Sequence, residues 1–569
     1  MASPNNITYF AETDARNERV KFGIKDEDRL RHIYSVGKTG MGKSVLLENL
    51  AIQDIQNGNG VAFLDPHGKT ADLLLDFIPE KRVKDVIYFA PFDIEHPIAF
   101  NVMEDVGPER RHLVVSGLMS AFEKLFGEES FSDRMQYILQ NTILALLEYP
   151  GATMLGINRM LSDKNYRNAV IANITDPSVK NYWTKEYAGY TERFAAESIP
   201  AIQNKIGQFT SNPLIRNIIG QQKSSFDIRE IMDEGKILIV NLSKGLVGEN
   251  NANLLGSMLV TKIYLAAMSR ANAGPQELAK LPNFYLYVDE FQSFANKSFA
   301  DILSEARKYK LSLNITHQYV EQMAEEVRAA VFGNVGTMIS FRVGSFDAEI
   351  LEKEFAPVFT MEDLVNLGKY QIYLKLMIDG VASQPFSATT LPPAPLPEVS
   401  FRDQTVAMSR KNYTRSKAEV EKAIVDWHES EKKLGANKET MPTKEEDANR
   451  ANKKRKQNKI IPAVPITPAI PDEKLKINPL AKALEEAIKA KNNTKNKEET
   501  ISLKELSRKN KKRDKKSPSP QNVQALKEAI EKAKANTNIK MDANDIDKKE
   551  SKSKKEVPEE TLRKILQGE

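Results

Sequence analysis

Cysteine is absent from this chain of 569 residues, which excludes disulfide bonds and thiolate metal sites. The six histidines are scattered and form no metal-binding pattern. Long apolar runs are also missing, because no window approaches the roughly 18 uninterrupted apolar residues of a membrane-spanning helix. Residues 1–19 are polar and lack the apolar centre of a signal peptide. We therefore expect a cytoplasmic protein without a direct membrane span, recruited to the inner face of a membrane only through partners.

No aromatic residue follows Trp427. That part of the chain is rich in Lys, Glu and Asn and is interrupted by a proline tract at residues 461–471, a composition typical of disorder. Residues 401–569 carry a net charge of +14, whereas residues 1–400 carry −9. A basic tail attracts nucleic acid or an acidic partner, or is simply solvated. We expect residues 437–569 to form a disordered basic tail.

A short phrase recurs within this tail. Residues 483–491 (ALEEAIKAK) resemble residues 525–534 (ALKEAIEKAK), and residues 559–566 are a looser echo. Each copy predicts an amphipathic helix that is too short to be stable alone in water. The copies are either docking segments that fold onto a partner or a similarity that arises only from the Lys-, Glu- and Ala-rich composition.

The most specific motif is the phosphate-binding pattern G-x-x-x-x-G-K-[ST], which residues 37–44 match in full. The apolar stretch Ile33–Val36 leads into it, and a helical apolar pattern follows. Its glycines let backbone N–H groups turn towards an anion, and the next helix adds the positive end of its dipole. We expect Lys43 to reach the β- and γ-phosphates of ATP and Ser44 to bind Mg²⁺. The predicted nucleotide-binding residues are Gly37, Lys38, Thr39, Gly40, Met41, Gly42, Lys43 and Ser44.

Two carboxylates end a second apolar stretch, Tyr285–Val288. Phosphoryl transfer needs one carboxylate on the metal and one on the attacking water. We therefore assign Asp289 to Mg²⁺ and Glu290 to the water that attacks the γ-phosphate. Alone, this pair is weak evidence, but together with residues 37–44 it predicts an ATPase.

Polar residues also end a strand pattern at residues 311–316. At the carboxyl edge of a parallel sheet, Gln318 would touch the γ-phosphate and report its hydrolysis, unless His317 and Gln318 only cap the strand. Arg307 is the candidate arginine finger for a neighbouring subunit, and Arg342 is its rival. We count Lys43, Glu290, Gln318 and Arg307 as the predicted catalytic residues.

Two motifs keep open roles. Residues 65–68 (DPHG) follow a strand pattern and are either a second layer around the nucleotide or a turn. Residues 241–249 follow another strand pattern in the same way, and the sequence does not settle their role.

Strand and helix patterns alternate along most of the first 400 residues. Strand patterns lie at residues 33–36, 60–65, 86–90, 237–242, 284–288, 311–316, 337–343 and 370–377. This order predicts an α/β fold with a mostly parallel sheet that is covered on both faces.

Long helical patterns interrupt this alternation at residues 111–126, 133–148 and 192–209. They predict an all-helical domain inserted at residues 105–212. Residues 1–104, which include a strand-bearing lead-in, and residues 213–400 would then form the ATPase domain. Residues 401–436 would add a C-terminal helix, expected at 413–434 and ended by Gly435.

Five motifs occur in a characteristic order around the helical insertion. They are GKTGMGKS at 37–44, FLDPHG at 63–68, NLSKG at 241–245, VDEFQ at 288–292 and NITHQ at 314–318. Over residues 7–435 the chain resembles the HerA/FtsK superfamily of ring-forming motor ATPases, which are RecA-like P-loop NTPases. Within it, the chain most resembles the TraG/TraD-type coupling proteins of conjugative type IV secretion.

The resemblance implies a homo-hexameric ring with ATP sites between subunits and DNA in the central channel. It also implies that residues 105–212 face the DNA–relaxase substrate. Many coupling proteins carry N-terminal membrane helices, which this sequence does not show. We therefore expect either that partners recruit the protein to a secretion channel, or that it is a translocase that acts outside secretion.

The predicted function is ATP-driven translocation of DNA or of a DNA–protein substrate, with contacts to phosphates that weaken with salt. One alternative is a HerA-like translocase for DNA repair or chromosome handling, with a partner such as a nuclease. Another is a secretion or pilus-assembly ATPase that moves protein. DNA-stimulated ATP hydrolysis would separate the first two functions from the third.

Overall fold

The computed structural model describes residues 6–14, 18–295 and 299–439. Beyond residue 439, the predicted tail with its recurring segments lies outside the described residues.

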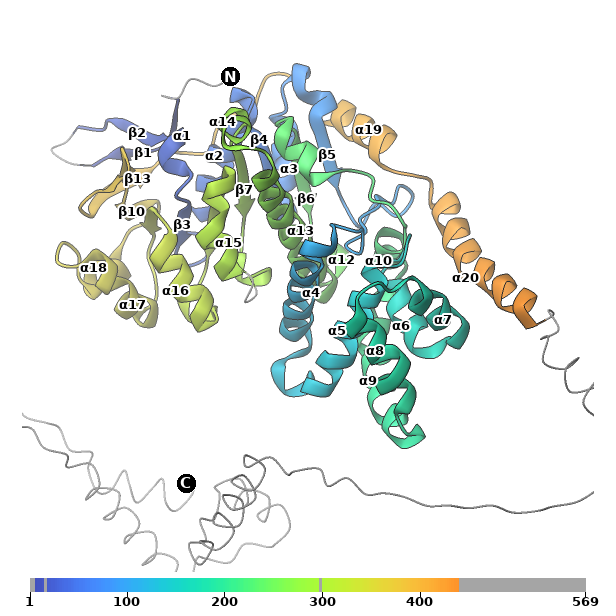
Figure 1. The fold of residues 1–569 in the computed structure, drawn as a ribbon. Coiled ribbons are helices and arrows are strands. Elements are labelled where there is room, and N and C mark those ends of the chain that lie inside the picture. The colour runs from blue at the N-terminus through green and yellow to red at the C-terminus, as the bar shows by residue number, and fades with distance from the viewer. Residues whose placement is uncertain (1–5, 15–17, 296–298, 440–569) are drawn as a thin grey trace, which may run out of the picture. The chain divides into compact units, whose positions relative to one another are not determined.

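A mixed sheet of 11 strands forms the centre of the fold, in the order β2-β1-β13-β10-β9-β3-β8-β7-β4-β6-β5 (Figure 1). Its strands are β1 (Ile7–Thr13), β2 (Lys21–Lys25), β3 (Ile33–Val36), β4 (Gly60–Asp65), β5 (Val86–Phe89), β6 (Ile237–Asn241), β7 (Phe284–Val288), β8 (Leu311–His317), β9 (Thr337–Ser340), β10 (Gln371–Lys375) and β13 (Phe386–Thr390). A small second sheet pairs β11 (Met377–Ile378) with β12 (Val381–Ala382). From β9 to β5 all neighbours pair in parallel, which confirms the predicted parallel sheet.

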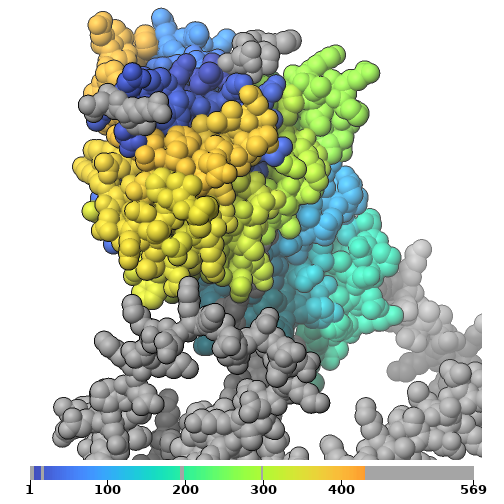
Figure 2. Space-filling model, turned by 90° about the vertical axis from the view of Figure 1, so that its left-hand side faces the viewer, coloured from blue at the N-terminus to red at the C-terminus, as the bar shows by residue number. Residues whose placement is uncertain are grey.

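The other edge of the sheet is antiparallel. Strand β10 pairs antiparallel with β9 and β13, and β13 pairs in the same way with β1. In Figure 2 the amino-terminal strands, in dark blue, lie against the later strands of this edge. The first strand of the chain is therefore held by one of the last, which closes the predicted ATPase domain.

Helices cover both faces of the sheet, because the buried strands carry apolar side chains on alternating sides. Val61 and Phe63 of β4 share a core with α2 and α3, whereas Ala62 and Leu64 share another with α13. The helices of the ATPase part are α1 (Asp26–Arg29), α2 (Lys43–Asn57), α3 (Lys69–Asp76), α11 (Ile228–Asp233), α12 (Lys244–Val247), α13 (Glu249–Ser269), α14 (Pro275–Lys280), α15 (Phe299–Glu305), α16 (Glu325–Asn334), α17 (Ser345–Phe355) and α18 (Met361–Asn366).

Residues 105–212 hold helices and no strand in the described part of the chain. The helices between β5 and β6 that precede α11 are α4 (Arg111–Phe126), α5 (Asp133–Leu147), α6 (Leu155–Ser162), α7 (Lys164–Asn173), α8 (Pro177–Asn181), α9 (Glu192–Thr210) and α10 (Pro213–Ile219). We call them the helical insertion (Figure 1). Their buried side chains continue without a break into the core on the α13 side of the sheet.

Helix α13 is long and apolar enough, by length and composition alone, to cross a membrane. Its most apolar window is 72% buried inside the protein, where α13 packs against α4 and α11. The core helix of a globular domain has these same properties, and the burial of α13 supports that interpretation.

Residues 391–428, which we call the C-terminal strap, run from β13 across the ATPase part towards the helical insertion. The amide of Asn49 on α2 donates to the carbonyl of Pro392 at 2.9 Å. Farther along, the backbone N–H of Tyr88 in β5 donates to the hydroxyl of Ser409 at 2.8 Å. The strap thus adds its own contacts to two elements of the sheet domain.

Two helices, α19 (Arg402–Tyr413) and α20 (Lys417–Glu439), form this region instead of the single helix expected. The prediction that Gly435 ends the helix is wrong, since α20 continues to Glu439. On α20, the ring of Trp427 lies 4.9 Å from the guanidinium of Arg159, which also lies 4.7 Å from the ring of Tyr166. This cation–π contact joins the strap to the helical insertion.

Candidate triphosphate site

The phosphate loop joins the carboxyl end of β3 to the start of α2 and is enclosed by its neighbours. The N–H of Gly37 donates to the carbonyl of His317 at 3.2 Å, and the N–H of Lys38 donates to that of Arg342 at 2.8 Å. The ammonium of Lys43 donates to the loop carbonyls of Gly37 and Lys38, at 2.5 and 3.1 Å. Burial lowers the pKa of Lys43. A buried cation at the N-terminus of a helix is suited to bind the phosphates of a nucleotide.

Glycine is required at two places in the loop. Gly40 and Gly42 have φ angles of 78° and 121°, which side chains rarely adopt. A Cβ atom on Gly42 would lie 2.9 Å from the Cδ1 atom of Tyr370. Backbone conformation therefore favours glycine at both positions, and lack of space adds to this at Gly42.

The two predicted metal ligands meet at this loop. The hydroxyl of Ser44 donates to Oδ2 of Asp289 at 2.9 Å, although the two residues come from different elements. Oδ1 of Asp289 accepts from the hydroxyl of Thr316 at 2.5 Å and from the N–H of Glu290 at 2.9 Å. A hydroxyl and a carboxylate beside a phosphate cradle are the oxygen ligands that Mg²⁺ prefers. These residues fit a magnesium ion shared with a nucleotide.

Glu290 lies at the same edge, with its backbone in the left-handed region at φ 49°. Its Oε1 accepts from Nε2 of Gln318 at 3.1 Å, and its Oε2 accepts from Nε2 of Gln292. Nε2 of His67 lies 3.9 Å from Oε1. Burial alone would raise the pKa of Glu290, but His67 and Lys43 bring it below its ordinary value. The carboxylate therefore stays ionised at neutral pH, as a group that polarises water must.

Gln318 links this carboxylate to the phosphate loop, because its Nε2 also donates to the hydroxyl of Thr39 at 2.6 Å. The preceding residue, His317, is fully buried, and burial lowers its pKa to about 3. Its Nδ1 lies 3.4 Å from the hydroxyl of Tyr34. A neutral imidazole packed in the core is a structural group, whereas Gln318 faces the site.

A model of the family described as type IV secretory system conjugative DNA transfer matches residues 7–334. The chain belongs to this family. Membership confirms the resemblance to the coupling proteins of conjugative type IV secretion. A comparison with curated proteins finds no match.

Several solved structures are similar to this chain. The plasmid coupling protein TrwB in complex with ADP and Mg²⁺ is 15% identical, with 69% of this chain and 97% of that chain covered and a TM-score of 0.49. TrwB with a non-hydrolysable ATP analogue is 16% identical, with 69% and 96% covered and a TM-score of 0.46. VirB4 of Thermoanaerobacter pseudethanolicus is 14% identical, with 71% and 99% covered and a TM-score of 0.44. Because these TM-scores are all below 0.5, the fold is assigned from the order of the strands and from the phosphate loop.

In this member of the conjugative DNA transfer family, the two candidate arginines lie at opposite ends of the parallel strands. Arg307 is exposed in a short 3-10 helix, Ala306–Tyr309, just before β8 begins. It therefore lies away from the phosphate loop of its own chain. Arg342 follows β9 and is half-buried next to that loop. A role for either arginine in a neighbouring subunit stays a prediction.

The DPHG motif contributes to the site in two ways. Asp65 accepts from the N–H groups of His67 and Ala71, at 2.8 and 2.9 Å, and so stabilises the turn into α3. Its neighbour His67 reaches towards Glu290. The motif is thus both a turn and part of the surroundings of the Glu290 carboxylate.

Three contacts of the site are not predicted from the sequence, although Thr39 itself is among the predicted nucleotide-binding residues. The hydroxyls of Thr39 and Thr316 and the amide of Gln292 orient the predicted residues directly. Each lies inside or beside a motif, where its residue type alone does not distinguish it from a spacer.

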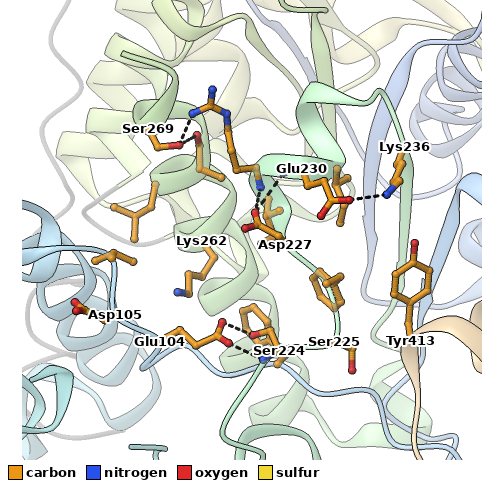
Figure 3. A pocket seen from close by; sticks show the side chains of 18 of the residues that line it. Glu104, Asp105, Ser224, Ser225, Asp227, Glu230, Lys236, Lys262, Ser269 and Tyr413 are labelled. Atoms are coloured by element: carbon orange, nitrogen blue, oxygen red, sulfur yellow. Dashed lines mark hydrogen bonds and ion pairs between the residues drawn. The ribbon is translucent and has the colours of Figure 1, made fainter. Parts of the chain in front are cut away.

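A separate cavity of about 490 Å³ lies where the segments that enter and leave the helical insertion meet α13 (Figure 3). Glu104 accepts from the N–H and the hydroxyl of Ser224 there, both at 2.7 Å. The ammonium of Lys262 points into this cavity, and burial lowers its pKa. The cavity is lined by none of the predicted nucleotide-site residues, so it does not belong to the triphosphate site.

Proposed function

We propose that the protein hydrolyses ATP to translocate DNA, or DNA joined to a relaxase, into a type IV secretion channel. The observation that carries this proposal is the meeting of Ser44 with Asp289, beside Glu290 and Gln318. The phosphate loop, this hydroxyl–carboxylate pair and the Glu290 carboxylate lie together at the carboxyl edge of the parallel strands, which supports a site for a nucleotide with Mg²⁺. Membership of a conjugative DNA transfer family supports DNA as the substrate.

Each residue of the site has a definite task in this proposal. Lys43 offsets the charge of the β- and γ-phosphates from a buried position. Ser44 and Asp289 would hold Mg²⁺, which neutralises charge that develops on the phosphates. Glu290 orients and polarises the attacking water, and Gln318 senses the γ-phosphate through its contacts with Thr39 and Glu290.

We extend this proposal to the assembly. Six copies would form a ring around DNA, with Arg307 or Arg342 reaching the phosphates of the next subunit. Residues 105–212, the predicted all-helical domain, would face the relaxase-bound substrate. The protein would work in the cytoplasm, at the inner face of the membrane, where channel components recruit it.

The test is ATP turnover by the purified protein, measured without DNA, with single-stranded DNA and with double-stranded DNA. We expect turnover that rises with DNA, falls with added salt because the contacts are to phosphates, and disappears in Lys43→Ala. A rate of ATP hydrolysis that does not change with either form of DNA would instead favour an ATPase that moves protein. A wild-type protein without turnover in the presence of Mg²⁺ would refute the ATPase assignment itself.

A further inference from the structure

The segment that follows the catalytic carboxylate is attached to three separate helices. This segment, residues 291–295, begins with a short 3-10 helix, Phe291–Ser293, directly after Glu290. Since Glu290 has a left-handed backbone, its conformation depends on how the following residues are held. The contacts of residues 291–295 therefore bear on the position of the carboxylate.

The first contact comes from the helical insertion. The ammonium of Lys124, near the end of α4, donates to the carbonyls of Gln292 and Ala295, the latter at 2.6 Å. Gln292 in turn donates its side-chain amide to Glu290. One residue thus separates Lys124 from the catalytic carboxylate, across the boundary between the insertion and the ATPase part.

Helix α4 is well placed to transmit movement. Gly117 faces α13 so closely that a Cβ atom there would lie 2.4 Å from a side-chain carbon of Thr261. Lys124 lies seven residues, or about two turns, after Gly117 and so on the same face of α4. A shift of α4 against α13 would therefore displace the ammonium together with the carbonyls that it holds.

The second and third contacts come from the ATPase part itself. The ammonium of Lys244 donates to the hydroxyl of Ser293 at 3.0 Å. The N–H of Lys244 donates to the carbonyl of Pro66, in the turn that carries His67, at 2.9 Å. The hydroxyl of Ser257 on α13 donates to the carbonyl of Phe294 at 3.2 Å. The NLSKG motif, whose role the sequence left open, thus connects both loops that surround Glu290.

We propose that Lys124 and Lys244 form a lysine clamp that positions Glu290, and that Lys124 makes the rate of hydrolysis depend on what the helical insertion binds. Neither ammonium contacts the nucleotide cradle, so both are positioning residues. This inference rests on the proposed ATPase function. The ligand of the insertion is the DNA polymer of that proposal.

Contacts inside the insertion give the end of α4 a link to a second helix. The ring of Phe126, two residues after Lys124, lies 6.0 Å from the ring of Phe209 on α9. Nζ of Lys205, also on α9, lies 4.5 Å from the centre of the Phe126 ring. A ligand that moves α9 would therefore act on the part of α4 that carries Lys124.

The experiment compares Lys124→Met and Lys244→Met with the wild-type full-length protein. The matched control is Lys185→Met, in the π-helix Tyr182–Glu186 that joins α8 to α9 of the helical insertion. Lys185 is exposed and has no hydrogen bond or ion pair to any described residue. Measurements are kcat for ATP with and without single-stranded DNA, and Kd for a fluorescent ATP analogue. We expect both clamp variants to lower kcat about fivefold or more while Kd stays within twofold. Only Lys124→Met should also lose most of the DNA stimulation.

Lys124→Arg keeps a cationic donor and should regain DNA stimulation at least in part, which a general loss of folding would not allow. The inference is overturned if both Met variants keep the wild-type kcat, if Lys124→Met is stimulated by DNA as strongly as the control, or if kcat and nucleotide affinity fall together. A wild-type protein that hydrolyses ATP without DNA stimulation would refute the DNA substrate of the proposed function. The kcat values without DNA would then still decide whether the clamp exists.

Discussion

Replacement of Glu290 by Gln tests the centre of the site, because it removes the negative charge and keeps the shape of the side chain. Two amide donors, from Gln292 and Gln318, point at the two oxygens of Glu290. A glutamine offers one carbonyl oxygen, so one of these donors loses its acceptor. An unpaired polar group of this kind costs about 1–3 kcal/mol when buried, and Glu290 is only partly buried, so the loss of stability should lie at the lower end.

The effect on catalysis should be much larger. A positioned acid–base group contributes typically about 10²–10⁴-fold to the rate, which corresponds to about 3–5 kcal/mol in the barrier. We therefore expect Glu290→Gln to lower kcat by that factor, while nucleotide affinity changes little because Lys43 and Ser44 are untouched. Steady-state ATP turnover, binding of a fluorescent ATP analogue and thermal unfolding give the three quantities. Glu321→Gln, a change at an exposed position nearby, is the control.

The assignment of Glu290 fails if the variant hydrolyses ATP within about threefold of the wild-type rate. A thermal midpoint that falls far more than in the control would instead mean that the lost rate reflects unfolding. A large loss of nucleotide affinity at normal stability would place Glu290 among the binding groups.

Three further predictions concern the structure around the site. Arg29→Met should lower the free energy of urea unfolding by about 3–5 kcal/mol, because Asp54 is fully buried and accepts from both terminal guanidinium nitrogens of Arg29. Combining Arg29→Met with Asp54→Leu should recover most of this loss. A single variant within about 1 kcal/mol of wild type would contradict this prediction. Burial lowers the pKa of His32 to about 4 and that of His317 to about 3, below their ordinary 6.5. The unfolded chain therefore binds protons at a higher pH than the folded protein, so the free energy of unfolding should fall as the pH drops from about 6.5 towards 4. The fall should be shallower in His317→Asn. Thermal midpoints measured across that pH range would check both expectations. Gly42→Ala should weaken nucleotide binding about tenfold or more in a titration, because strained backbone costs about 1–3 kcal/mol; unchanged affinity would show that the loop tolerates a side chain there.

The parallel part of the fold follows directly from sequence patterns. Short apolar runs such as Gly60–Asp65 become central strands because both of their faces are covered, and periodicity with flanking turns is enough to find them. The antiparallel edge is harder to predict from the sequence. Its pairing of Ala11 with Thr390 joins the two ends of the ATPase part, and no local pattern encodes such a long-range register.

The strand β8 shows why polar residues of the site were hard to assign. Its sequence alternates between apolar and polar residues, which usually indicates a strand with one face in water, yet every residue is buried. The hydroxyl of Ser312 donates to the carbonyl of Arg29, and that of Thr316 donates to Asp289. Two of the three polar side chains on this face thus make hydrogen bonds inside the protein, whereas the buried amide of Asn314 has no hydrogen-bond partner among the described residues. Only the three-dimensional neighbours reveal this difference.

The motifs suggest which functional groups the site needs, but not which residues outside the motifs contact it. Lys43, Ser44, Asp289 and Glu290 were assigned because phosphoryl transfer needs their functional groups. By contrast, Lys124 comes from a helix outside every motif, and a lysine near the end of a helix has many ordinary explanations. Its relation to the site depends on the packing of α4 against α13.

The C-terminal strap has a practical consequence for shortened versions of the protein. Truncation at residue 400 would remove Ser409 from the N–H of Tyr88 and Trp427 from the guanidinium of Arg159. It would also uncover apolar surface next to the helical insertion, where Val420 and Ile424 pack against Leu155. Such a fragment would be expected to aggregate and to mimic a loss of tail function. A deletion meant to isolate the role of the tail should therefore begin after Glu439, where the last described helix ends.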